Sequence, residues 1–149
     1  MRWMATLVLG CVTAALGPVA HADAEARASR RLARVESKET QLLGAAAFTY
    51  WDGLRWSDGA RAASVVDPAL QGAFREWYAA AAGLTRYEDV SVLALDVAPP
   101  APGQPREARV RVRVRAYTVP AQILFEETVE QRWVRTPAGW VLPWVPPAP

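Results

Sequence analysis

The spacing of the apolar residues changes once along this chain, and that change limits the folds available to it. Before Gly83, apolar side chains recur at intervals of three, four and seven residues, which is the pattern of amphipathic helices. After Gly83 they alternate with polar ones, most regularly in residues 108–116, where alanine or valine takes every second position and arginine the positions between. A helical first half followed by a β second half predicts an α+β fold, with helices packed on one face of an antiparallel sheet.

The first and longest predicted helix covers residues 24–54. Its polar positions are filled by arginine, glutamate and lysine, and the opposite face is apolar. That apolar face contains Leu32, Val35, Leu42, Leu43, Ala46 and Tyr50.

Two shorter helices are expected to follow. Ser57-Asp58-Gly59 provides a break and an N-cap for a helix that ends near Val66. Asp67 as N-cap and Pro68 at the first helical position predict a third helix, which Gly83 closes as its C-cap.

Four strands are predicted after Gly83. Residues 87–97 carry apolar side chains on both faces, so we expect this strand to be covered on both sides. A proline-rich loop over residues 99–105 leads to the half-buried strand 108–116, whose arginines face water. A turn near Pro120 leads to a strand over 122–135, and a tight turn at 136–139 leads to an edge strand over 140–145, because Pro143 lacks an N–H group for sheet pairing.

The register of the central hairpin follows from matching the apolar faces of its two strands around the Pro120 turn. This places Val112 opposite Val129 and Ala108 opposite Trp133. The same register sets Arg115 across from Glu126 and Arg111 across from Glu130, pairs that would neutralise part of the arginine ladder. It also turns Glu127 and Gln131 toward the inner face of the sheet.

The N-terminus predicts export from the cytoplasm. Residues 1–22 have the features of a signal peptide, with an apolar run from Trp3 to Leu16 and the small residues Ala20 and Ala22 at a cleavage site, which indicates a periplasmic or secreted protein. One alternative is a lipoprotein, because residues 8–11 resemble a lipobox and Cys11 would then carry a lipid. Another is an uncleaved membrane anchor with the domain in the cytoplasm, since four arginines follow the apolar run and only Arg2 precedes it. These four are Arg27, Arg30, Arg31 and Arg34.

Length and composition narrow the function classes. The 149 residues suit one domain, which we place at 23–145, followed by a proline-rich tail at 146–149. The net charge of +2 gives no reason to expect a nucleic-acid partner. If cleavage removes His21 and Cys11, the mature chain can build neither a histidine-based catalytic site nor an ordinary zinc site, and nothing in the sequence indicates a metal or a cofactor.

The predicted chain has three helices followed by an antiparallel sheet, with Phe48-Thr49-Tyr50-Trp51 in the first helix and a closing hairpin of Trp133 and Gly139-Trp140. This pattern resembles the nuclear transport factor two-like superfamily, and its small exported bacterial members in particular. The resemblance implies a cone in which a curved sheet of four or more strands wraps the long helix and leaves a pocket at the open end. It leaves function open, because some members such as ketosteroid isomerase catalyse reactions in that pocket while others only bind or dimerise. The family commonly has a short strand between its second and third helices. In this chain the corresponding segment, Val65-Val66, is too short to predict such a strand.

The residues around that expected pocket give two hypotheses. The first is a non-catalytic envelope domain that binds a small apolar ligand or a protein partner, with a homodimer through the sheet as a further possibility. The second is an isomerase-type enzyme in which Glu127 is the base and a tyrosine, Tyr50 first among them, donates a hydrogen bond. The tryptophans that could floor a pocket are Trp51, Trp56, Trp77, Trp133, Trp140 and Trp144. The candidate pocket residues are Tyr50, Trp51, Tyr78, Glu127, Gln131, Trp133 and Trp140.

Overall fold

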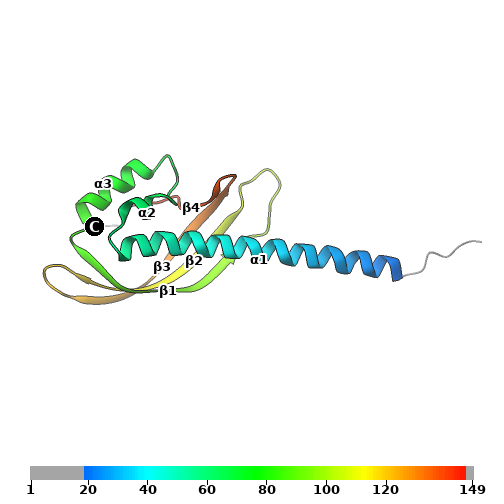
Figure 1. Ribbon diagram of the computed structural model, residues 1–149, viewed down its shortest axis with the longest axis horizontal. Helices are drawn as coiled ribbons and strands as arrows, with labels where there is room; N and C mark the ends of the chain where they lie inside the picture. Colours follow the sequence, from blue (N-terminus) through cyan, green and yellow to red (C-terminus); the bar gives the residue numbers. More distant parts are fainter. Residues whose placement is uncertain (1–18, 147–149) are drawn as a thin grey trace, which may run out of the picture. The chain divides into compact units, whose positions relative to one another are not determined.

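The structure is a computed structural model that describes residues 19–146, with side chains from Glu25 onward. Its helices are α1 (Val19–Arg55), α2 (Gly59–Ala63) and α3 (Gln71–Ala81), and its strands are β1 (Thr85–Val97), β2 (Glu107–Thr118), β3 (Leu124–Thr136) and β4 (Gly139–Val141), as Figure 1 shows. The chain divides into the compact units Met1–Arg34 and Val35–Pro149. Most of the expected signal peptide, including Cys11, lies outside the described residues, and α1 is continuous across the expected cleavage position between Ala22 and Asp23.

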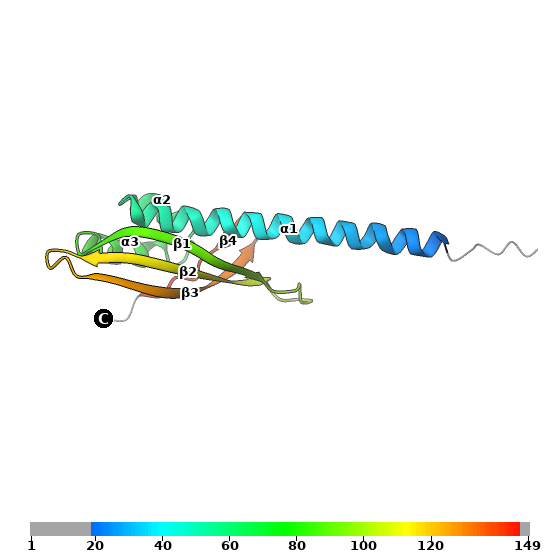
Figure 2. The same cartoon turned by 90° about the horizontal axis from the view of Figure 1, so that it is seen from below.

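The four strands form one antiparallel sheet in the order β1-β2-β3-β4. Within the unit Val35–Pro149, the sheet curls around the last part of α1, which lies along its concave face, and the three helices share that side (Figures 1 and 2). This arrangement confirms the predicted α+β fold, with one long and two short helices on a curved four-stranded sheet.

Strand β2 forms the centre of the core, as its alternating sequence predicts. Its alanines and valines are all buried and its arginines are all exposed. The predicted register is confirmed at Val112 opposite Val129 and at Ala108 opposite Trp133. Helix α1 adds Leu43, Ala47, Tyr50, Trp51 and Leu54 to the same core, at spacings that keep them on one face of the helix.

Two ion pairs fix α1 to the end of the sheet that lies near the β1–β2 loop. Arg106 binds Glu36 at 2.6 Å, and Arg135 binds Glu39 at 2.8 Å. The arginine ladder pairs differently from our prediction. The register sets Arg115 opposite Glu126 and Arg111 opposite Glu130 as expected, yet the guanidinium of Arg115 binds Glu88 at 3.1 Å and Glu130 lies 4.0 Å from Arg109. Long side chains reach diagonal neighbours as easily as direct ones.

The prediction that β1 is covered on both faces is wrong. No residue of β1 is fully buried, and Val92 and Leu93 are 44% and 49% exposed. The reason is the position of β1 at the free edge of the sheet, where register shifts between Tyr87 and Asp89 and between Val92 and Ala94 interrupt its pairing.

Three predicted element boundaries also need correction. Asp67 and Pro68 form a turn that precedes α3, in which the Asp67 carboxylate accepts a hydrogen bond from the Ala69 N–H group at 2.9 Å, and the helix itself begins at Gln71. Gly83 follows α3 without adopting a positive φ, so it is not a left-handed C-cap. The last strand is shorter than predicted and ends at Val141, since Leu142 pairs with Val66 in an isolated parallel bridge. The bridge lies between α2 and α3, where the family that this chain resembles commonly has a short strand.

Candidate functional site

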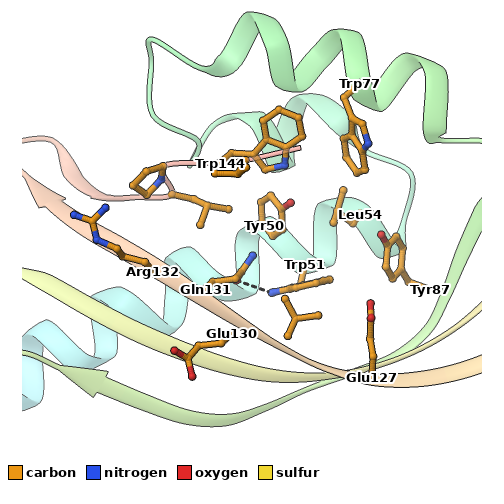
Figure 3. A pocket seen from close by; sticks show the side chains of 14 residues that line it. Tyr50, Trp51, Leu54, Trp77, Tyr87, Glu127, Glu130, Gln131, Arg132 and Trp144 are labelled. Carbon is orange, nitrogen blue, oxygen red and sulfur yellow. Dashed lines mark hydrogen bonds between the residues drawn. The ribbon is translucent and has the colours of Figure 1, made fainter. Parts of the chain in front are cut away.

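A cavity of about 510 Å³ opens between α1, α3, the inner face of the sheet and the segment after β4 (Figure 3). Its size lies within the range of small-molecule pockets. It is lined by Tyr50, Trp51, Leu54, Trp77, Tyr87, Glu127, Val129, Glu130, Gln131, Arg132, Leu142, Pro143, Trp144 and Val145.

Local structure explains why these side chains meet. Leu54 follows Tyr50 by four residues and Trp51 by three on α1, so the three side chains share the face that the helix turns to the sheet. On β3, Glu127, Val129 and Gln131 are two residues apart and point to the inner face. Glu130 and Arg132 occupy the intervening positions and contribute only to the rim.

One buried hydrogen bond orders the floor of the cavity. The indole Nε1 of Trp51 donates to Oε1 of Gln131 at 3.0 Å, and the two residues are 7% and 9% exposed. An indole N–H can only donate, so Gln131 must turn its oxygen toward Trp51. The amide NH₂ of Gln131 is therefore left as a hydrogen-bond donor within the cavity, on the side of Tyr50 in Figure 3.

Burial alters two tyrosines of the cavity wall. Burial is the main cause that raises the pKa of the Tyr50 hydroxyl far above its usual range, with the Trp144 indole acting weakly in the opposite direction. Burial also raises the pKa of Tyr87, and the negative charge of Glu127 adds to that shift. Both phenols therefore stay protonated at neutral pH and can donate hydrogen bonds.

Glu127 is the carboxylate that β3 places on the inner face. Its side chain is exposed at the mouth of the cavity and points toward Tyr87 in Figure 3. No arginine or lysine of residues 25–146 lies within ion-pair distance of it. The two charged residues of the rim are different, because Glu130 lies 4.0 Å from Arg109 and Arg132 donates hydrogen bonds to Glu107, which holds the pKa of Glu107 below its usual range.

The structure brings together four of the residues that the sequence put forward for the pocket: Tyr50, Trp51, Glu127 and Gln131. The other three lie elsewhere. Trp133 and Trp140 are buried in the core, and Tyr78 stacks on Phe74 with its ring centroid at 6.0 Å and lines a separate small cleft.

The remaining tryptophans divide in the same way. Trp77 and Trp144 line the cavity, whereas Trp56 is 69% exposed and lies outside it. Sequence reasoning did not put Tyr87 or Leu54 in the pocket. The helical spacing from Tyr50 could have found Leu54, but the register shift beside Tyr87 hides its inward direction from any alternation pattern.

Two further properties concern the described residues as a whole. In the described part of the chain, no three histidine, cysteine, aspartate or glutamate side chains are placed to hold a metal ion. None of the helices between residues 19 and 146 is long and apolar enough to cross a membrane.

Comparisons with known proteins support the fold. No protein-family model matches the chain, and no curated protein matches it. A solved structure from Streptomyces avermitilis, a candidate dehydratase of the NTF2-like (nuclear transport factor two-like) family, superposes with a TM-score of 0.51 at 14% sequence identity. The match covers 72% of this chain and 92% of the other. At this identity the likeness shows the NTF2-like fold and nothing about activity, since that family contains enzymes and non-catalytic binding proteins.

Proposed function

We propose, on the premise of an NTF2-like fold, that this protein is a non-catalytic binding domain that takes a small, mostly apolar ligand into the cavity under α1 and α3. The observation that carries the proposal is the composition of that cavity. Five aromatic side chains and several aliphatic ones form its walls, and a few polar groups converge on it. An apolar concave site with a small number of placed polar groups is the usual design of a ligand pocket.

The test is binding of a neutral apolar fluorescent probe, N-phenyl-1-naphthylamine, followed through the probe and through quenching of tryptophan fluorescence. Val129 is half-buried on the cavity wall, so Val129→Phe should fill the space and weaken binding about tenfold or more. Val92 is an exposed strand valine outside this cavity, and Val92→Phe is the matched control that should leave binding unchanged. Circular dichroism of both variants checks that the fold is kept. Equal binding by the protein and its Val129→Phe variant would show that the probe sits elsewhere.

A second candidate is an enzyme that abstracts a proton next to a carbonyl group. The observation that favours it is that Glu127 lines the same cavity as two neutral phenols, Tyr50 and Tyr87. In this reaction the Glu127 carboxylate would take the proton from the carbon, the electron pair would move onto the carbonyl oxygen, and a tyrosine hydroxyl would donate a hydrogen bond to that oxygen. The exposure of Glu127 argues against it, because such a reaction favours an active site that excludes water from the reacting groups.

Deuterium exchange separates the two candidates. If the enzyme hypothesis holds, the protein should accelerate the exchange of hydrogen for deuterium next to the carbonyl group of a cyclic enone in D₂O. Glu127→Gln should then abolish that acceleration. For a binding domain, we expect no acceleration, and Glu127→Gln should leave binding of the neutral probe intact.

Export is part of the same proposal and rests on the N-terminal sequence. An intact mass beginning at Asp23, from a soluble envelope fraction of the native host, would support a periplasmic or secreted domain. A lipidated mass beginning at Cys11 that disappears in Cys11→Ser would instead support a lipid-anchored envelope protein. An uncleaved chain in the membrane fraction would support the anchor hypothesis.

A further inference from the structure

We propose that the ligand of this cavity is an apolar organic cation, such as a substituted ammonium ion, whose charge lies between Glu127 and the aromatic side chains of α1 and β1. The inference rests on the proposed function, because it specifies the chemistry of the ligand that the cavity binds.

The first argument is the charge of the residues that line the cavity. Among the lining residues, three carry a charge at neutral pH: Glu127, Glu130 and Arg132. Glu130 and Arg132 stand on the outer face of β3, where Figure 3 shows them pointing away, and each has an oppositely charged neighbour there. Among the described lining residues, Glu127 at the mouth is therefore the one charged side chain on the inner face of the sheet, and its charge is negative.

No ion pair compensates that charge within the part of the chain that the structure describes. The arginines nearest in register to Glu127 belong to the outer face of β2, because the direct partner of Glu127 is the buried residue Val114. The influence of Glu127 nevertheless reaches the interior, since its charge contributes to the raised pKa of Tyr87. An unpaired carboxylate at an apolar cavity favours a cation and repels an anion.

The second argument is the arrangement of the rings beside Glu127. The ring centroids of Trp51 and Tyr87 are 6.0 Å apart with planes at 75°, and those of Tyr50 and Trp51 are 5.4 Å apart with planes at 89°. These are edge-to-face contacts, in which the edge of one ring packs against the face of its neighbour. All three rings also line the cavity beside Glu127. The face of an aromatic ring carries the negative part of its quadrupole, so a ring face that lines the cavity attracts a cation.

The two features select a particular class of ligand. A strongly hydrated ion such as sodium would gain little from ring faces, whereas a substituted ammonium ion combines a diffuse positive charge with apolar substituents that fill the remaining cavity. The amide NH₂ of Gln131 can donate to an acceptor such as a hydroxyl oxygen elsewhere on the same molecule.

The experiment compares two probes of nearly the same shape, (3-hydroxyphenyl)trimethylammonium and its neutral isostere 3-tert-butylphenol, by isothermal titration calorimetry. We expect the protein to bind the cation about tenfold more tightly than the neutral probe. Glu127→Gln should bring the two affinities to within about twofold of each other. Glu126→Gln is the matched control, because Glu126 is exposed on the outer face of the same strand and its removal should keep the preference.

The outcomes distinguish this inference from the function on which it rests. Equal affinity for the two probes in the unmodified protein, or a preference that survives Glu127→Gln, would overturn the inference and leave the apolar binding site standing. Failure of both probes to bind would overturn it as well. If N-phenyl-1-naphthylamine also failed to bind, the proposed function itself would be wrong.

Discussion

The hydrogen bond between Trp51 and Gln131 gives the sharpest test of how the cavity floor is built. Replacing Gln131 with methionine keeps an unbranched side chain of similar length but removes the acceptor of the Trp51 N–H group. That group lies in a side chain only 7% exposed, and its partner atom is 3.0 Å away. A buried donor left without a partner costs about 1 to 3 kcal/mol, so we expect Gln131→Met to lower the free energy of unfolding by about 2 kcal/mol.

The assay is equilibrium unfolding in urea, followed by tryptophan fluorescence and by circular dichroism. With a denaturant dependence of about 2 kcal/mol per molar, a loss of about 2 kcal/mol moves the midpoint down by about 1 M. Thr128→Met is the matched control, because Thr128 is exposed on the outer face of the same strand and should change stability by less than about 0.5 kcal/mol.

A double-mutant cycle with Trp51→Phe isolates the interaction from the loss of packing. Phenylalanine has no N–H group to satisfy, so Gln131→Met should cost about 1 kcal/mol less in the Trp51→Phe background than in the unmodified protein. If the two costs are equal, or if Gln131→Met leaves the urea midpoint unchanged, the indole N–H is satisfied by water in the cavity and our account of the floor is wrong.

Three further predictions concern other parts of the fold. Burial raises the pKa of the Tyr50 hydroxyl above its usual 10.0, so the folded protein keeps this proton at a pH where the unfolded chain loses it. The buried neutral phenol therefore contributes its full share of stability below pH 10, and that share declines as the pH rises past 10. In urea unfolding, the free energy of unfolding of Tyr50→Phe should fall less between about pH 9 and about pH 11 than that of the unmodified protein. A Cβ on Gly59 would meet the Tyr78 ring at 2.4 Å, so Gly59→Ala should destabilise the protein by about 1 to 3 kcal/mol. A Cβ on Gly72 in α3 would meet nothing within 4 Å, so Gly72→Ala should stabilise the protein by about 0.5 to 1 kcal/mol. The melting temperature should therefore fall for the first variant and rise for the second. Asp58 accepts the Arg61 N–H at 3.0 Å as the N-cap of α2, so Asp58→Ala should cost about 1 kcal/mol, and an unchanged melting temperature would show that α2 is fixed by packing alone.

Much of the architecture could be predicted because it follows from local periodicity. The change from helical spacing to alternation at Gly83 separated the helices from the sheet, and the strict alternation of β2 left one possible buried face. Pairing that face with β3 across a short turn then fixed the register correctly, with Val112 opposite Val129. A shift of one residue would have set the apolar face of one strand against the polar face of the other, so the pattern excluded such registers, and the Pro120 turn selected among the rest.

The predictions that were wrong share a different cause, because the features they concern depend on residues that are distant in sequence. Strand β1 has an apolar composition that suits a covered strand, but its place at the edge of the sheet leaves Val92 and Leu93 exposed. The ion pairs of the arginine ladder were misassigned because side chains as long as Arg115 choose among several acids within reach. Nothing in the local sequence ranks those acids.

The sequence by itself therefore determined the order and type of the elements, the inner and outer faces of β2 and β3, and the presence of Tyr50, Trp51, Glu127 and Gln131 on the surfaces that face each other. Only the tertiary structure decided which aromatic residues enclose the cavity. Trp133 and Trp140 lie in the hydrophobic core, whereas Trp77 and Trp144 line the cavity. The path of the chain after β4 and the position of α3 decide this, because they set the distance of each indole from the sheet. Those positions result from packing between segments far apart in the sequence, and no periodicity within one segment records them.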